Sequence, residues 1–273
     1  MNVFDVVRVW FFLLLSGFSL SVFSAPTAEL DAFWQSSDES SAQVVDHARW
    51  QTLLDRYLNS QHASGVNRFD YAKVTTADKT LLTSYLNHLQ GLDPRTLNRA
   101  EQKAYWINLY NALTVKLILD HYPIKSITKL GGFFSFGPWD DEVASIVNHD
   151  LTLNDIKHHI LRPIWKDNRI HYAVNCASIG CPNLSKYAYT ASLTDNMLNQ
   201  AASSYVNHAR GASFKEGELI VSSIYNWYKV DFGGTDQSVI QHLLKYADAD
   251  LKQQLEGYKG AVKDDYNWAL NRP

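Results

Sequence analysis

Both cysteines of the chain lie in one short segment, His171 to Pro182 (HYAVNCASIGCP). Cys176 and Cys181 could form a local disulfide in an oxidising compartment, because Gly180 lets the loop between them bend. Alternatively, one of them is a nucleophile activated by a nearby histidine, and a position at the first turn of a helix would lower the thiol pKa of Cys181. A zinc site using Cys176, Cys181 and His171 is held in reserve, since C-x4-C with one nearby histidine is a loose ligand spacing. The sequence leaves the three chemistries open.

Two histidines are candidates for a general base. His171 lies in the segment 169–175 (RIHYAVN), whose alternation predicts a strand with His171 and Asn175 on the same face. His158 lies on a predicted short helix, where it shares a polar face with Arg162. A solvated helix face is the simpler interpretation of that second pattern. The functional interpretation makes His158 part of the site.

Asn108 and Asn111 stand three residues apart in an otherwise apolar helix. Burying a carboxamide without a partner costs roughly 1–3 kcal/mol, so each must be hydrogen-bonded or must face a polar cavity. The simpler interpretation is that they hold the backbone of neighbouring loops. The functional one places them in the wall of a pocket, where they orient a substrate or stabilise an oxyanion.

These residues need a helical scaffold to position them. Asn98 and Glu101 have capping-box spacing and predict a long helix over 99–121, which Pro123 ends. Because this helix is apolar nearly all round, we expect it in the middle of the domain. The fold predicted for 44–273 is a single, helix-rich α+β domain with a small β-sheet. Its other expected elements are helices over about 44–58, 78–89, 152–162 (ending before Pro163), 193–210 and 238–246, and strands over 169–175 and 219–222.

The N-terminus has the layout of a secretory signal peptide. Residues 9–23 carry no charge, Arg8 precedes them and the small residues Ser24 and Ala25 follow. We therefore expect a signal peptide over 1–24, cleaved near Ser24, and a periplasmic or secreted protein; an uncleaved anchor is the alternative. No membrane span is expected after its removal. The Ser-, Asp- and Ala-rich stretch 25–43 is expected to form a loosely packed leader.

Composition excludes several classes of protein. The 273 residues are 46% hydrophobic and 13% aromatic, which is too apolar for a disordered chain. A net charge of −3 gives no electrostatic footprint for nucleic acid. The motifs of nucleotide enzymes, zincins and elbow-type serine hydrolases are absent from the sequence. No cofactor is expected.

The chain resembles a known family, domain of unknown function 547, over about 50–271. The family has no settled activity to carry over, but the resemblance implies which residues follow its pattern. Lys157 and Asn267 depart from that pattern, since acidic residues are usual at both positions. The segments that carry the resemblance are FDYAKV (69–74), EQKAYWINLYNALTVKLILDHYP (101–123), LTLNDIKHHILRP (151–163), RIHYAVNCASIGCPNL (169–184), SSIYNWYKVDFG (222–233) and YNWALN (266–271). The pattern residues are Asn108, Tyr110, Asn111, His158, Arg162, His171, Cys176, Cys181 and Pro182.

Two functional hypotheses follow. The first is a thiol-dependent hydrolase or acyl transferase that acts on amide or ester bonds of a small-molecule or peptide substrate, on a fold similar by analogy to papain or transglutaminase. Those folds usually place the cysteine at the start of the central helix, where this chain has Asn108. The second hypothesis is a non-enzymatic envelope domain that binds a ligand or partner and is stapled by a Cys176–Cys181 disulfide. In the first, Cys176 or Cys181 is the nucleophile, His171 or His158 is the base, and Asn108, Tyr110, Asn111, Arg162 and Asn175 form the pocket.

Overall fold

The computed structural model describes residues 26–132 and 137–273. The expected signal peptide over 1–24 therefore lies outside the described residues. Within the described part of the chain, no helix is long and apolar enough to cross a membrane.

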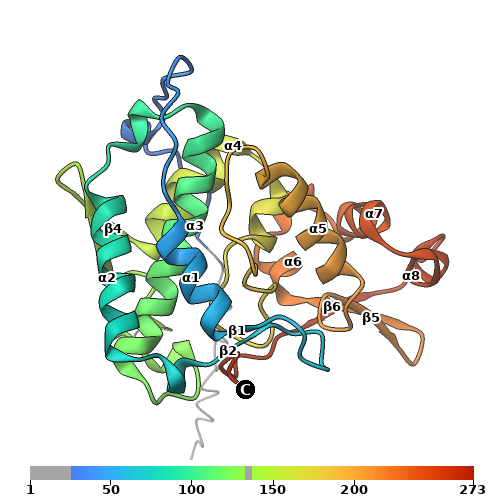
Figure 1. Ribbon diagram of the computed structural model, residues 1–273. Coiled ribbons are helices and arrows are strands. Elements are labelled where there is room, and N and C mark those ends of the chain that lie inside the picture. Colours follow the sequence, from blue (N-terminus) through green and yellow to red (C-terminus); the bar gives the residue numbers. More distant parts are fainter. Residues whose placement is uncertain (1–25, 133–136) are drawn as a thin grey trace, which may run out of the picture.

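Three helices form the N-terminal half of the fold and pack side by side (Figure 1). They are α1 (Ala48–Tyr57), α2 (Thr76–Gln90) and α3 (Arg99–His121). The last one has the bounds expected from the sequence, and the Asn98 side chain caps it by accepting from the Glu101 amide at 2.9 Å. The Glu101 carboxylate instead accepts from the Val45 amide at 2.8 Å. Glu101 therefore attaches the chain that leads into α1 to the first turn of α3.

The remaining helices and small sheets lie partly against α3 and partly in the C-terminal half, which confirms a helix-rich α+β fold. In the described residues β1 pairs with β2, β3 pairs with β4, and β6 pairs antiparallel with β5 and parallel with β7. The bounds are β1 (Leu58–Asn59), β2 (Arg68–Phe69), β3 (Glu142–Ile146), β4 (His149–Thr152), the π-helix η5 (Asp155–Leu161), α4 (Arg162–Trp165), the 3-10 helix η6 (Asn168–Tyr172), α5 (Thr194–Val206), β5 (Ala212–Lys215), β6 (Glu218–Ser222), α6 (Ser223–Trp227), the 3-10 helix η7 (Lys229–Phe232), α7 (Asp236–Tyr246), α8 (Ala249–Leu255) and β7 (Val262–Asp265).

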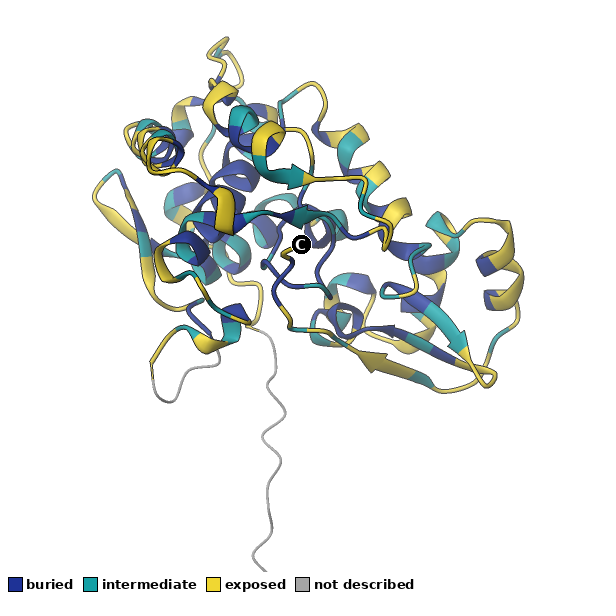
Figure 2. Ribbon diagram, turned by 60° about the horizontal axis from the view of Figure 1, so that its bottom comes forward, coloured by how far each residue is buried: buried dark blue, intermediate teal, exposed yellow. Residues whose placement is uncertain are grey.

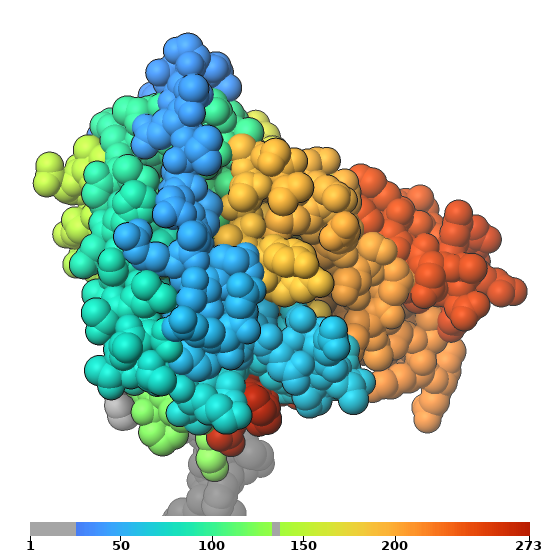
Figure 3. Space-filling model, viewed as in Figure 1, coloured from blue at the N-terminus to red at the C-terminus, as the bar shows by residue number. Residues whose placement is uncertain are grey.

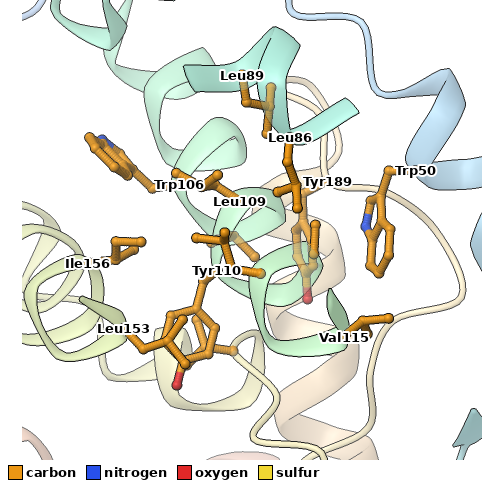
Figure 4. Packing of buried hydrophobic residues seen from close by; sticks show 14 of the residues in the cluster. Trp50, Leu86, Leu89, Trp106, Leu109, Tyr110, Val115, Leu153, Ile156 and Tyr189 are labelled. Atoms are coloured by element: carbon orange, nitrogen blue, oxygen red, sulfur yellow. The ribbon is translucent and has the colours of Figure 1, made fainter. Parts of the chain in front are cut away.

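Buried apolar side chains form two clusters. The first gathers around α3 and includes Trp50, Trp106 and Tyr189, which Figure 4 shows around the helix. The second lies between α5, β6 and α7 and includes Tyr205 and Leu243. In Figure 2 the buried residues run through both halves of the molecule, with exposed residues on the outer turns. The chain between η5 and α5 connects the two clusters and carries the cysteines.

The leader expected to be loosely packed is in fact attached to the domain. Figure 3 shows residues after 26 lying along the surface of the first half. Trp34 is only 1% exposed, and its ring lies edge-on to Trp106 at 5.2 Å. The Glu29 amide also donates to the His158 carbonyl at 3.1 Å. A buried indole and backbone hydrogen bonds hold this segment, so the prediction of loose packing from its polar composition was wrong.

Two predictions of local structure near the cysteines were also wrong. The segment 169–175 is not a strand but begins in η6, because the Asp167 side chain accepts from the Arg169 amide at 3.0 Å and caps a 3-10 turn. Such local side-chain bonds compete with sheet pairing. The helix expected to end before Pro163 continues through Trp165, since Pro163 occupies the first turn of α4, where an N–H is not required.

Candidate functional site

A pocket of about 350 Å³ opens between the two clusters. This volume suits a small molecule or a short stretch of peptide. The pocket combines side chains from α3, η5, η6 and α6 with residues of the C-terminal tail. Its lining includes Tyr110, His158, His171, Cys176, Cys181 and Tyr266. The structure therefore brings together both predicted histidines and both cysteines.

A carboxylate and an aromatic ring fix the orientation of His171 in this pocket. It is 2% exposed, its Nε2 lies 2.7 Å from Oδ2 of Asp231, and its ring stacks on Tyr228 at 4.3 Å. Burial lowers the His171 pKa to about 3, although the hydrogen bond to Asp231 acts in the opposite direction. The neutral ring must carry its proton on Nε2 to bind the carboxylate. Nδ1 then holds a lone pair, and no hydrogen-bond partner for it exists among the described residues.

Arg162 supports the same carboxylate from α4. Its Nε and Nη2 donate to the two oxygens of Asp231 at 2.6 and 3.1 Å, which is a bidentate pair. Burial alone would raise the Asp231 pKa, but the hydrogen bonds from His171 and Arg162 outweigh burial and hold it below its usual range. Asp231 is therefore ionised at neutral pH and fixes the orientation of His171.

His158 differs from His171 in the direction of its hydrogen bond. Its Nδ1 lies 2.8 Å from Nη1 of Arg162, which can only donate, so the proton of neutral His158 is on Nε2. Burial, reinforced by the charge of Lys157, lowers the His158 pKa. His158 can thus only donate, through Nε2, whereas His171 can accept through Nδ1. The predicted solvated face was wrong, because His158 and Arg162 are 1% and 5% exposed.

Cys176 and Cys181 are joined by a disulfide whose Cα atoms are 6.1 Å apart. Cys176 is half-buried and its Sγ lies 3.1 Å from the Tyr266 hydroxyl, while Cys181 is 3% exposed. Gly180 serves close packing rather than bending, since a Cβ there would lie 2.9 Å from the Asn267 amide nitrogen. Across residues 26–132 and 137–273, no three His, Cys, Asp or Glu side chains are grouped to hold a metal ion.

The predicted carboxamides hold the backbone around the pocket instead of lining it. Asn108 exchanges two hydrogen bonds with the backbone of Tyr189, at 2.8 and 2.9 Å. Asn111 donates to the Ala173 carbonyl at 2.9 Å and accepts from the Asn175 amide at 2.8 Å. These four bonds tie the chain on both sides of the cysteines to α3.

Asn175 works in the same way inside the cysteine loop. Its Nδ2 donates to the Pro182 carbonyl at 2.7 Å, and its Oδ1 accepts from the Ala177 amide at 2.8 Å. Of the five residues predicted for the pocket, Tyr110 is in its lining, and Arg162 lies behind the histidines. The other three, Asn108, Asn111 and Asn175, position the loop.

Sequence reasoning missed Asp231 and the lysine of the pocket. Asp231 is the acidic residue between Val230 and Phe232, and an ionisable residue inside an apolar, aromatic stretch was the signal that could have identified it. Lys157 departs from the family pattern, which by itself predicts no role for it. Its side chain lines the pocket.

Comparison with known proteins adds one match. No curated protein and no solved structure matches the chain. A family model described as "Protein of unknown function, DUF547" matches residues 94–206, which include α3, η5 and both cysteines. Asp231 and Tyr266 lie beyond the matched range. The resemblance predicted from the sequence is confirmed over residues 94–206, which match the DUF547 family model.

Proposed function

We propose that the protein is a thiol-dependent hydrolase or acyl transferase that acts on ester or amide bonds. The observation that carries the proposal is the state of His171, whose proton is held by Asp231 while its Nδ1 lone pair has no partner in the described structure. A base needs that arrangement to take a proton from a thiol, with a carboxylate fixing the tautomer. Both cysteines line the same pocket.

The reaction requires the reduced pair. An external dithiol reduces the Cys176–Cys181 disulfide and becomes a disulfide itself, which leaves two thiols in the pocket. We assign the nucleophile to Cys176, because it is the more exposed of the two. Its thiol gives its proton to His171 Nδ1, and the thiolate attacks the carbonyl carbon of the substrate.

Breakdown of the tetrahedral adduct completes the cycle. The bond to the leaving oxygen or nitrogen breaks, and the leaving group takes the proton from His171. Water or an acceptor then attacks the acyl-Cys176 thioester, passes a proton to His171 and restores the thiol as the acyl product leaves. The Nε2–H of His158 is suited to donate to the oxyanion of both adducts.

We also propose that the protein is exported to the periplasm or secreted, because its N-terminus has the features of a signal peptide. An oxidising compartment favours the disulfide form. In such a compartment the enzyme would stay inactive until a reductant opens the pair.

The disulfide favours a second candidate function, a ligand- or partner-binding domain of the cell envelope in which the Cys176–Cys181 bond is a permanent staple. In that case reduction would loosen the loop and weaken binding. The two candidates therefore predict opposite effects of reductant.

The test is acylation of the reduced protein by an activated ester such as p-nitrophenyl acetate, followed by mass spectrometry of the modified peptide. We expect an acyl group on Cys176, formed only after reduction and absent from Cys176→Ser. His171→Gln should slow acylation roughly 10²–10⁴-fold, the usual contribution of a general base. His121→Gln is the matched control, since His121 is exposed at the end of α3. Equal acylation of the His171 and His121 variants, or none after full reduction, would reject the proposal.

A further inference from the structure

One lysine lies in the pocket without a carboxylate partner. Lys157 belongs to η5 and is adjacent in sequence to His158, and its Nζ lies 3.1 Å from the Tyr228 hydroxyl and 4.2 Å from the centre of the Tyr228 ring. In the described residues no carboxylate lies within salt-bridge distance of this ammonium group. A cation that rests on an aromatic ring is partly desolvated and gains from an incoming anion.

The other charges near the pocket are already balanced or lie at its edge. Arg162 is neutralised by its bidentate pair with Asp231. Asp140 also lines the pocket, but it is exposed and accepts from Nδ2 of Asn154 at 2.7 Å. The neutral histidines add no charge at pH 7. Lys157 therefore supplies the uncompensated positive charge inside this site.

An aromatic wall completes the recognition surface. Trp227 stacks on Trp268 with ring centres 5.5 Å apart, and Tyr266 contacts both rings at 4.8 and 4.6 Å. Trp139 meets Trp268 edge-on at 5.6 Å. All four side chains line the pocket. Such a wall binds the apolar body of a ligand and leaves its charged end to a separate group.

Lys157 and the candidate base His171 contact the same tyrosine ring. The Tyr228 ring that contacts the ammonium group stacks on His171 at 4.3 Å. A ligand that is paired with Lys157 and spread over the aromatic wall would therefore pass close to His171. The pocket volume of about 350 Å³ limits it to small-molecule size.

We infer that the pocket binds a carboxylate-bearing ligand with an apolar body, whose carboxylate pairs with Lys157 and whose body packs on Trp227, Tyr266 and Trp268. The further statement that this ligand is the acyl part of the substrate rests on the proposed function. The binding itself does not require a reduced cysteine or any turnover.

The experiment compares 3-phenylpropionate with its neutral isostere 3-phenylpropionamide, binding to the full chain with the disulfide intact, by calorimetry at pH 7. We expect the acid to bind at least about tenfold more tightly, which corresponds to one charge-assisted hydrogen bond. High salt should reduce that preference. Because nothing is reduced or acylated, failure of thiol chemistry would leave this result unchanged.

Three variants assign the effect to one side chain. Lys157→Met should abolish the preference for the acid, Lys157→Arg should retain most of it, and Lys252→Met, which removes an exposed charge on α8, should leave it unchanged. If Lys157→Met does not fold, the acid-to-amide affinity ratio of the natural chain and its salt dependence still test whether the pocket recognises the ligand's negative charge. Equal binding of acid and amide, or an unchanged preference in Lys157→Met, would overturn the inference.

Discussion

Two groups of buried polar side chains on neighbouring elements have different roles. Asn108 and Asn111 on α3 direct both their amide and carbonyl groups to backbone partners. His171 and Asp231 are also hydrogen-bonded, but one ring nitrogen of His171 keeps an unused lone pair at the pocket. Complete pairing is typical of a structural role. A buried polar atom without a partner costs free energy and needs a functional explanation.

The difference extends to charge. The asparagines are neutral, so a few well-made hydrogen bonds are enough to offset the free-energy cost of burying them on α3. The pocket group places a carboxylate between Arg162 and His171, and removing either Arg162 or Asp231 leaves the charge of the other uncompensated in a poorly solvated site. We therefore expect the two groups to respond differently to substitution and to pH.

The largest effect should follow removal of the carboxylate. Asp231→Ala leaves the guanidinium of Arg162, whose side chain is 3% exposed, without its partner. We expect a loss of about 3–5 kcal/mol of unfolding free energy, measured by urea denaturation. The control is Asp236→Ala, which breaks an exposed pair with Lys229 and should cost less than about 1 kcal/mol. Equal losses of unfolding free energy in Asp231→Ala and Asp236→Ala would contradict the special cost of unpairing the buried Arg162.

A smaller loss is expected in the neutral group. Asn111→Ala leaves the Ala173 carbonyl and the Asn175 amide without partners, and we expect about 1–3 kcal/mol in the same denaturation. Asn226→Ala, which removes an exposed hydrogen bond to Asp264, is the control and should change little. A neutral result for Asn111→Ala would show that its bonds do not fix the cysteine loop.

The two groups should also differ in how the free energy of unfolding depends on pH. Burial lowers the pKa of His171 to about 3, so between about pH 6.5 and 3 the unfolded chain binds a proton that the folded chain does not. This contribution to stability is complete above pH 6.5 and is lost as the pH falls, by about 1.4 kcal/mol per pH unit. His171→Gln should flatten the dependence by that amount between pH 6 and 4, and Asn111→Ala should not. The same slope in both variants would contradict the assignment.

Much of the scaffold could be predicted from the sequence. The apolar run over 99–121 and the capping spacing of Asn98 and Glu101 gave the central helix its correct bounds, because both signals are local. The sequence also pointed to the segment 171–182 because both cysteines lie in it, and the structure places His171, Cys176 and Cys181 in the pocket lining. The strand expected over 169–175 failed because the side chain of Asp167 caps a 3-10 turn, a local bond that alternation of apolar residues does not detect.

The sequence by itself determined the fold class, the buried helix and the segment where chemistry could occur, since these depend on residue type and near spacing. Only the tertiary structure decided how the groups are used. It placed Asp231 next to His171, 60 residues away in the sequence, and Lys157 next to Tyr228. It also placed Arg162 at Nδ1 of His158, which leaves Nε2 to carry the proton of that ring. The role of each group depends on its partner, and long-range packing of the chain selects that partner.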